Sequence, residues 1–182
     1  MTATLPDTNL YHSSCLVECG RFTVRDLSLS WEKVALLWAM ISKFRTLFSD
    51  LTRGDVDNFL RFITDTDSVW LEIYDDENLN GIVCLTNLQK VIDTDAHVIF
   101  FDREVSNKVD VCKAVVRWSF DTLPLQRMSV DVPVIYHRTI RLVRGIGFKF
   151  EGERRRAVLI GGHWLNVLQF GITRAEVYQC HS

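Results

Sequence analysis

One stretch of sequence decides the fold, and it runs Thr139-Ile140-Arg141-Leu142-Val143-Arg144-Gly145-Ile146-Gly147-Phe148-Lys149-Phe150-Glu151-Gly152-Glu153-Arg154. Ile140, Val143 and Ile146 recur every three residues, which predicts a helix with one apolar face. Gly145 and Gly147 are expected to end this helix, because glycine adopts the left-handed cap conformation without steric cost. Aromatic and charged residues then alternate, which predicts a strand entering a sheet.

The composition suits one globular domain. The chain has 182 residues, of which 47% are hydrophobic and 24% charged, so it is long and apolar enough to bury a core. The formal net charge of -2 gives no argument for nucleic acid or a membrane surface. We find no membrane-spanning apolar run and no signal peptide, and we expect a loose leader over residues 1–18 and a single domain over 19–182.

Five cysteines without a Cys-x-x-Cys pair indicate reduced thiols and a cytoplasmic protein. Residues that zinc can bind gather only near the two termini, and their spacing fits no common zinc module. These residues are His12, Cys15, Cys19, Cys180 and His181. We therefore predict no metal site.

Hydrophobic periodicity predicts the remaining elements. Strands are expected at 21–27, 69–74, 82–88, 96–101, 128–132 and 164–174, and helices at 55–63 and 106–122. The strongest helix follows Ser30 as N-cap, with a predicted core stripe of Trp31, Val34, Ala35, Trp38, Ile41, Phe44 and Phe48. The strand at 96–101 is apolar on both faces and should be central. This order of elements predicts an α/β or α+β fold around one sheet.

Several motifs resemble those of the GNAT acetyltransferase superfamily, in particular its ribosomal-protein N-terminal acetyltransferase (RimJ/RimL-type) branch. The matching segments are Gly147-Phe148, Glu151-Gly152, Arg154, Gly161 to Trp164 and Phe170 to Glu176. The resemblance extends from about residue 95 to 178. It implies the GNAT fold, a single mixed and mostly antiparallel sheet flanked by helices. It also implies an acetyl-CoA-dependent N-acetyltransferase acting on an amine such as a protein N-terminus.

The resemblance places acetyl-CoA at the start of the predicted helix 106–122. In the family, a glycine-containing loop and the helix N-terminus hold the pyrophosphate, since free N–H groups favour an anion. The corresponding contacts here are Ile99, Phe100, Phe101, Arg103, Val105, Ser106, Asn107 and Lys108. Arg103 is retained, but Ser106 and Lys108 replace small residues and Glu104 has an unfavourable charge. Lys108 is expected either to bind phosphate or to block its approach, and the alternative is an ordinary capped helix start.

The same resemblance suggests which groups move protons during acyl transfer. Val143 stands where many GNAT enzymes have a tyrosine that protonates the leaving thiolate. The branch has an Asn-x-x-Ser pattern at the helix start instead, and Tyr136 and Thr139 occupy those positions. Thr139 is the predicted donor to sulfur and Tyr136 the alternative donor, whereas the simpler interpretation makes Thr139 a capping residue.

The base is less specified by the sequence. His97 on the central strand titrates in a suitable range, Glu72 on a neighbouring strand is the second candidate, and a satisfied core histidine is the simpler interpretation of His97. Asn166 stands where the branch usually has aspartate, which puts a substrate-binding role there in doubt.

Arginines recur beside the opening stretch, at 138, 141, 144 and 154–156. They predict either a solvated helix face or a cationic rim for an acidic substrate, a coenzyme phosphate or RNA, although no RNA-binding motif is present. The altered loop leaves a second hypothesis open: a GNAT-fold binding or assembly module without catalysis, which a homodimer or another protein partner would complete.

Overall fold

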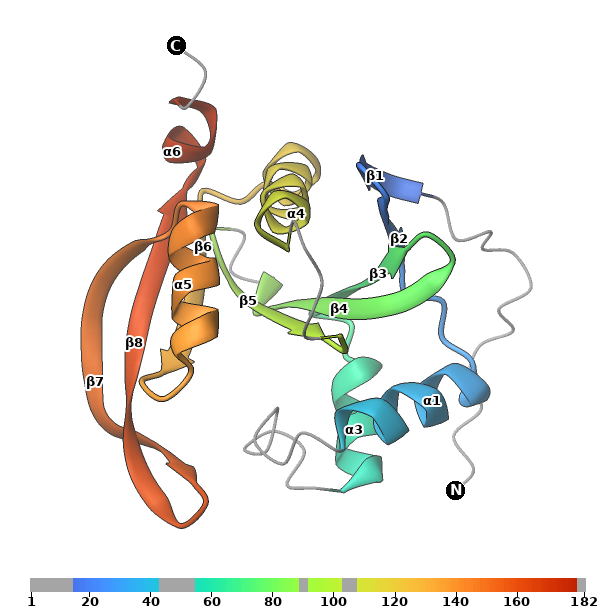
Figure 1. Ribbon diagram of the computed structural model, residues 1–182, viewed down its shortest axis with the longest axis horizontal. Coiled ribbons are helices and arrows are strands. Elements are labelled where there is room, and N and C mark those ends of the chain that lie inside the picture. The colour runs from blue at the N-terminus through green and yellow to red at the C-terminus, as the bar shows by residue number, and fades with distance from the viewer. Residues whose placement is uncertain (1–14, 43–54, 89–91, 103–107, 180–182) are drawn as a thin grey trace.

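The computed structural model describes residues 15–42, 55–88, 92–102 and 108–179. Eight strands form one sheet in the order β1-β2-β3-β4-β5-β6-β8-β7 (Figure 1). They are β1 (Cys15–Cys19), β2 (Phe22–Asp26), β3 (Val69–Asp75), β4 (Asn78–Thr86), β5 (Asp93–Phe100), β6 (Arg127–Pro133), β7 (Lys149–Ile160) and β8 (His163–Thr173). Neighbouring strands are antiparallel except for the parallel pair β5 and β6. The predicted single mixed sheet is therefore confirmed.

Helices cover both faces of this sheet. They are α1 (Trp31–Ile41), α3 (Val56–Ile63), α4 (Lys108–Thr122), α5 (His137–Ile146) and the short α6 (Arg174–Gln179). One core lies between the sheet and α4 with α5, and the other lies between the sheet and α1 with α3 (Figure 1). Strand side chains alternate between the cores, so that Leu71 and Val83 face α4 whereas Trp70 and Ile82 face α1. None of the described helices is both long enough and apolar enough to span a membrane.

The stretch from Thr139 to Arg154 contributes to α5 and β7, and one prediction about it is corrected. Gly147 ends α5 with a φ of 117°, and its N–H donates to the carbonyl of Arg144, as predicted. Gly145 does not end the helix but lies inside its last turn. A Cβ there would lie 3.2 Å from Cγ2 of Val109, so glycine at 145 lets α5 pack closely on α4.

The first predicted helix is also partly corrected. The hydroxyl of Ser30 accepts from the N–H of Lys33 at 3.1 Å, which confirms the predicted N-cap. The buried stripe consists of Val34, Leu37 and Ile41, while Trp31 is 54% exposed. Leu37 was missed because the aromatic residues around it suggested a different helix face. Phe44 and Phe48 lie outside the described residues.

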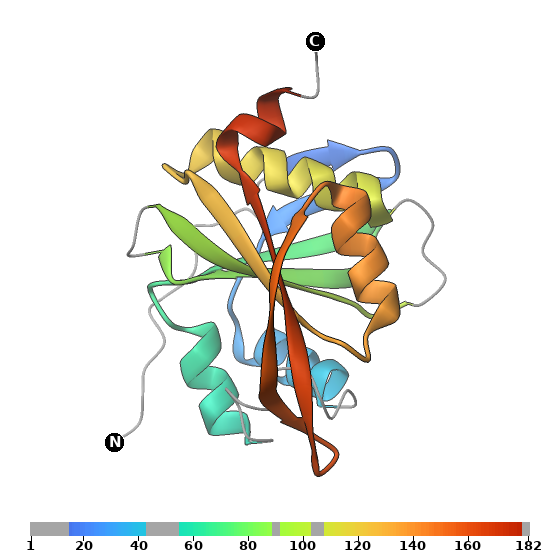
Figure 2. The same cartoon turned by 90° about the vertical axis from the view of Figure 1, so that its left-hand side faces the viewer.

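The sheet extends further than the sequence suggested. Cys15–Cys19 pairs with β2 as β1, so residues 15–18 of the predicted leader belong to the sheet. The β7–β8 hairpin crosses the other strands steeply, and α6 follows it (Figure 2). Arg174 joins this end to the body, because its guanidinium donates to the carbonyls of Leu125 at 2.8 Å and Leu123 at 3.1 Å.

The parallel pair β5–β6 positions the site. Its register covers only Asp93–Asp95 against Arg127–Ser129, although both strands continue beyond it. The junction is tied by side chains, since Arg127 lies 3.4 Å from the Asp93 carboxylate and the Ser129 hydroxyl donates to it at 3.0 Å. Past this junction, β6 pairs with β8 along its length and leaves β5. The two strands therefore separate in the middle of the sheet.

Candidate active site

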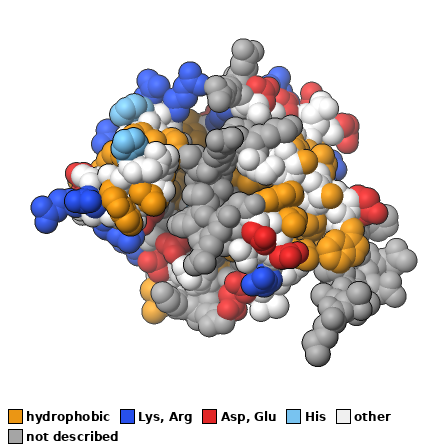
Figure 3. Space-filling view, turned by 90° about the horizontal axis from the view of Figure 1, so that it is seen from below, with side chains coloured by type: hydrophobic (Ala, Val, Ile, Leu, Met, Phe, Trp, Pro, Cys, Tyr) orange, Lys and Arg blue, Asp and Glu red, His pale blue; other side chains and the backbone are white. Residues whose placement is uncertain are grey.

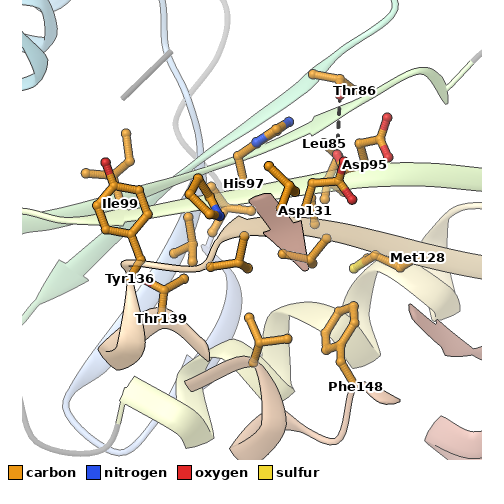
Figure 4. Close-up of a pocket in the computed structure, with 18 of the residues that line it drawn as sticks. Leu85, Thr86, Asp95, His97, Ile99, Met128, Asp131, Tyr136, Thr139 and Phe148 are labelled. Carbon is orange, nitrogen blue, oxygen red and sulfur yellow. Dashed lines mark hydrogen bonds between the residues drawn. The ribbon is translucent and has the colours of Figure 1, made fainter. Parts of the chain in front are cut away.

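A cavity of about 470 Å³ lies where β5 and β6 separate (Figure 4). Its walls come from β4 to β8 and from the facing sides of α4 and α5. Apolar residues from the helix side form one part, namely Cys112, Val115, Val116, Val143, Ile146 and Phe148. The polar side chains are Thr86, Asn87, Asp95, His97, Asp131, Tyr136, Thr139 and Arg154. An elongated ligand with an apolar arm and a polar reacting end fits such walls.

Tyr136 contributes the most informative group of the cavity. It immediately precedes α5, where it makes no side-chain cap. Its hydroxyl oxygen is buried and has no hydrogen-bond partner among the described residues. A buried unpaired hydroxyl costs about 1–3 kcal/mol, and a ligand that offered a partner would remove this cost. Thr139 lines the cavity one turn further along α5.

Four predicted site residues thus meet in one cavity: Tyr136, Thr139, His97 and Ile99. His97 and Ile99 lie on β5 beyond its junction with β6, and His97 pairs in register with Cys84 of β4. Figure 4 shows these four residues around the same space. The family resemblance had suggested Tyr136, Thr139 and Ile99, and the central-strand prediction had suggested His97; their catalytic and binding roles stay predictions.

Glu72 does not line this cavity. It lies on β3, 1% exposed, facing the layer of α1, and its carboxylate lies 2.6 Å from Nζ of Lys33. The Tyr74 hydroxyl donates to the same carboxylate at 3.2 Å. Burial lowers the pKa of Lys33, but hydrogen bonds to Glu72 and Tyr74 outweigh it, so the pKa is raised. A carboxylate held in this way is unsuited to act as the base.

Two carboxylates that no sequence motif marked also line the cavity, namely Asp95 and Asp131. Together with Arg154 they form what we call the polar end of the cavity. Asp95 and Asp131 come from β5 and β6, and the register Asp95↔Ser129 places both on one face of the sheet (Figure 4). Asp131 accepts from Nη1 of Arg154 at 2.9 Å. Alternation along 93–97 and 127–133 could have indicated this polar face, but the parallel pairing that joins the two strands was not visible in the sequence.

The coenzyme loop is only partly described. Arg103, Val105, Ser106 and Asn107 lie outside the described residues. Phe100 and Phe101 are not among the residues that line the cavity. Lys108 begins α4, and its ammonium donates to the carbonyl of Asp102 at 2.8 Å and lies 4.9 Å from the Phe100 ring centroid. Burial lowers the pKa of Lys108 and outweighs the opposing effect of Asp102, while the nearby charge of Arg138 lowers it slightly further.

The arginines differ in their position relative to the cavity. Arg138, Arg141 and Arg144 are exposed along α5, as are residues 154–156 on β7. Lys and Arg side chains gather at the edge of the molecule on which β7 and β8 lie (Figure 3). Arg154 is the one that lines the cavity.

Metal chemistry has no visible site in the described part of the chain, where no group of three or more His, Cys, Asp or Glu could hold an ion. The terminal residues His12, Cys180 and His181 lie outside that part. The described cysteines, which are Cys15, Cys19, Cys84 and Cys112, are free thiols.

Comparison with known proteins identifies the fold. No protein-family model and no curated protein sequence matches the chain. The spermidine N-acetyltransferase from Vibrio cholerae, solved in complex with CoA and spermine, matches with a TM-score of 0.73 and 18% identity over 87% of this chain and 99% of its own. A ribosomal-protein-S5-alanine acetyltransferase from Vibrio fischeri matches with a TM-score of 0.65 and 14% identity over 86% and 95%. At these identities the likeness establishes the fold, which is that of the GNAT acetyltransferases.

Proposed function

We propose that the protein is an acetyl-CoA-dependent N-acetyltransferase acting on an amine. One observation carries this proposal: the unpaired, buried hydroxyl of Tyr136 points to a ligand in the cavity between β5 and β6. Fold neighbours that acetylate amines support the reaction class. The RimJ/RimL-like motifs favour a protein N-terminus as acceptor, and a polyamine is the other acceptor that the neighbours suggest. The free thiols of the described cysteines favour a cytoplasmic location for this protein, where thiols stay reduced.

The side chains that line the cavity are of the kinds that would contact the thioester-bearing arm of acetyl-CoA. Val115, Val116 and Val143 offer apolar walls from α4 and α5, and the hydroxyls of Tyr136 and Thr139 supply donors near them. Acetyl-CoA would supply an activated acetyl thioester. Lys108 lies at the start of α4, and its ammonium, which has three N–H donors, gives one of them to the Asp102 carbonyl.

We assign the proton transfers to polar side chains that line the cavity. Acyl transfer forms a C–N bond, breaks the C–S bond, removes a proton from the amine and gives one to the departing thiolate. Tyr136 is favoured as the donor to sulfur because its hydroxyl has no other partner among the described residues, and Thr139 is the alternative. His97 takes the amine proton, directly or through water. Asp95 and Asp131 attract the ammonium form of the acceptor.

A titration with acetyl-CoA tests the proposal. Binding in the micromolar range, measured by calorimetry, is the expected result, followed by acceptor screening with N-terminal peptides and polyamines. Absence of binding at millimolar ligand would instead favour the second candidate, a GNAT-fold module without catalysis. The observation that favours this candidate is the engagement of Lys108 with Asp102 and Phe100, at the position where the family has a small residue.

A further inference from the structure

Strand β7 contains a large bulge opposite Asn166. The register passes from Arg154↔Val167 directly to Val158↔Leu165, so residues 155–157 face Asn166 alone. Arg156 adopts a left-handed φ of 51°, which costs a non-glycine residue about 1 kcal/mol. Bulges of this kind re-aim side chains and are frequent beside active sites.

The Asn166 side chain holds this bulge with both ends of its amide. Its Oδ1 accepts from the N–H of Arg156 at 2.9 Å, and its Nδ2 donates to the Glu153 carboxylate. Its backbone carbonyl accepts from the N–H of Val134 at 3.0 Å. One residue therefore connects the bulge to the segment between β6 and α5.

Both connected segments line the candidate active site. Arg154, Ala157 and Val158 flank or belong to the bulge and face the cavity, and Tyr136 follows Val134 by two positions. Arg154 also reaches across to Asp131, where its guanidinium offsets the charge of this carboxylate. Arg154 is the last residue of β7 in register with β8 before the bulge, so we expect the course of the bulge to influence its contact with Asp131.

Replacing the amide at position 166 by a carboxylate would remove the hydrogen bond to Glu153. An aspartate side chain there could still accept from Arg156, but it could not donate to Glu153, and two carboxylates would face one another. The aspartate that the family resemblance leads one to expect at this position would therefore lose the hydrogen bond to Glu153 and face its like charge. This chain's departure from the pattern is explained by its neighbour in the structure.

We propose that Asn166 is a positioning residue that sets acceptor specificity, by holding Arg154 on Asp131 and thereby limiting the negative charge offered to a cationic amine. The inference rests on the proposed function, because it assigns the polar end of the cavity to the acceptor. It predicts that releasing the bulge shifts preference toward amines with more than one positive charge.

The test compares Asn166→Asp with the double variant Asn166→Asp/Glu153→Gln, and uses Glu153→Gln alone as the matched control. In the double variant the side-chain amide at position 153 donates to the carboxylate at position 166, so the hydrogen bond is restored with donor and acceptor exchanged. Affinities for butylamine and for a linear triamine are measured by titration in the presence of coenzyme A. Amide hydrogen exchange at Arg156 reports the bulge itself.

The single variant Asn166→Asp should increase the ratio of triamine to butylamine affinity about tenfold, as expected for coupled neighbours, and speed exchange at Arg156. Both effects should be reversed in the double variant and be absent in the control. An unchanged ratio, or exchange that changes without the ratio, would overturn the inference and leave Asn166 a purely structural residue. Because the readout is amine binding, a wild-type protein that binds amines but does not acetylate them refutes the proposed function alone. A wild-type protein that binds neither amine refutes the inference.

Discussion

Lys33 and Glu72 form an ion pair in the layer between α1 and the sheet. Nζ of Lys33 lies 2.6 Å from Oε1 of Glu72, whose side chain is 2% exposed. The Tyr74 hydroxyl lies 3.2 Å from each partner, accepting from Lys33 and donating to Glu72. The Arg25 guanidinium lies 4.8 Å from the centroid of the Tyr74 ring at the edge of this group, but Glu72 itself is buried, so removal of Lys33 leaves a buried carboxylate without its closest partner.

Lys33→Met should therefore destabilise the protein by about 3 kcal/mol, since the Glu72 charge loses its partner. Urea unfolding at neutral pH measures this loss. The double variant Lys33→Met/Glu72→Met should recover most of it, because no buried charge remains. A single variant as stable as wild type would show that the pair contributes nothing.

Tyr136→Phe should lower turnover about 100-fold, within the range for loss of a positioned acid, while acetyl-CoA affinity stays nearly the same. Single-turnover kinetics and calorimetry separate the two quantities. Thr139→Ala provides the comparison: if it reduces turnover and Tyr136→Phe does not, the donor to sulfur is Thr139. If neither variant affects turnover, the thiolate takes its proton from water.

Lys108→Met tests whether the first residue of α4 holds phosphate. Acetyl-CoA binding should weaken roughly threefold to tenfold at low salt, and the difference should shrink as salt rises, because the interaction is partly exposed. Lys113→Met changes the same charge on an exposed position of the same helix and should have little effect. Stronger binding by Lys108→Met would show instead that the lysine obstructs the ligand.

The Glu176 carboxylate should make the stability of the folded protein depend on pH in the acidic range. Its hydrogen bonds with Lys149 and the N–H of Thr173 lower its pKa to about 2 from an ordinary value of 4.5. A lowered folded-state pKa means that the stabilisation is present above pH 4.5 and is lost as pH falls toward about 2. Thermal unfolding across this range should therefore show a smaller pH dependence in Glu176→Gln than in wild type. Parallel curves for the two proteins would contradict the assignment.

Local sequence patterns were sufficient for most of the elements. The spacing of Ile140 and Val143 predicted α5, and Gly147 marked its end, because these properties depend on neighbours in sequence. The strand Cys15–Cys19 was missed, since its pattern is half exposed and becomes regular only when paired with β2. Gly145 was misplaced for the same reason: its packing partner, Val109, lies on another helix.

The site was predictable only where motifs marked it. Tyr136 and Thr139 were found through the resemblance, and His97 through its central strand. Asp131 and its pairing with Arg154 could not be found, because the pairing depends on β6 and β7 lying on either side of β8. Glu72 was named as a candidate base although it does not line the cavity. Its local sequence does not indicate the ion pair with Lys33, which is distant in the chain.

The short junction between β5 and β6 has a mechanical consequence. It divides the sheet into two parts, β1 to β5 and β6 to β8, and among the described residues the paired register that joins them covers Asp93–Asp95, with Ile92 accepting from Gln126 and Arg127 beside it. A change in the angle between these two parts breaks few backbone hydrogen bonds, although the core shared with α4 and α5 spans both parts. A ligand that bridges the two parts would stiffen the whole molecule, and its effect on the melting temperature would therefore report on the junction as well as on its own contacts.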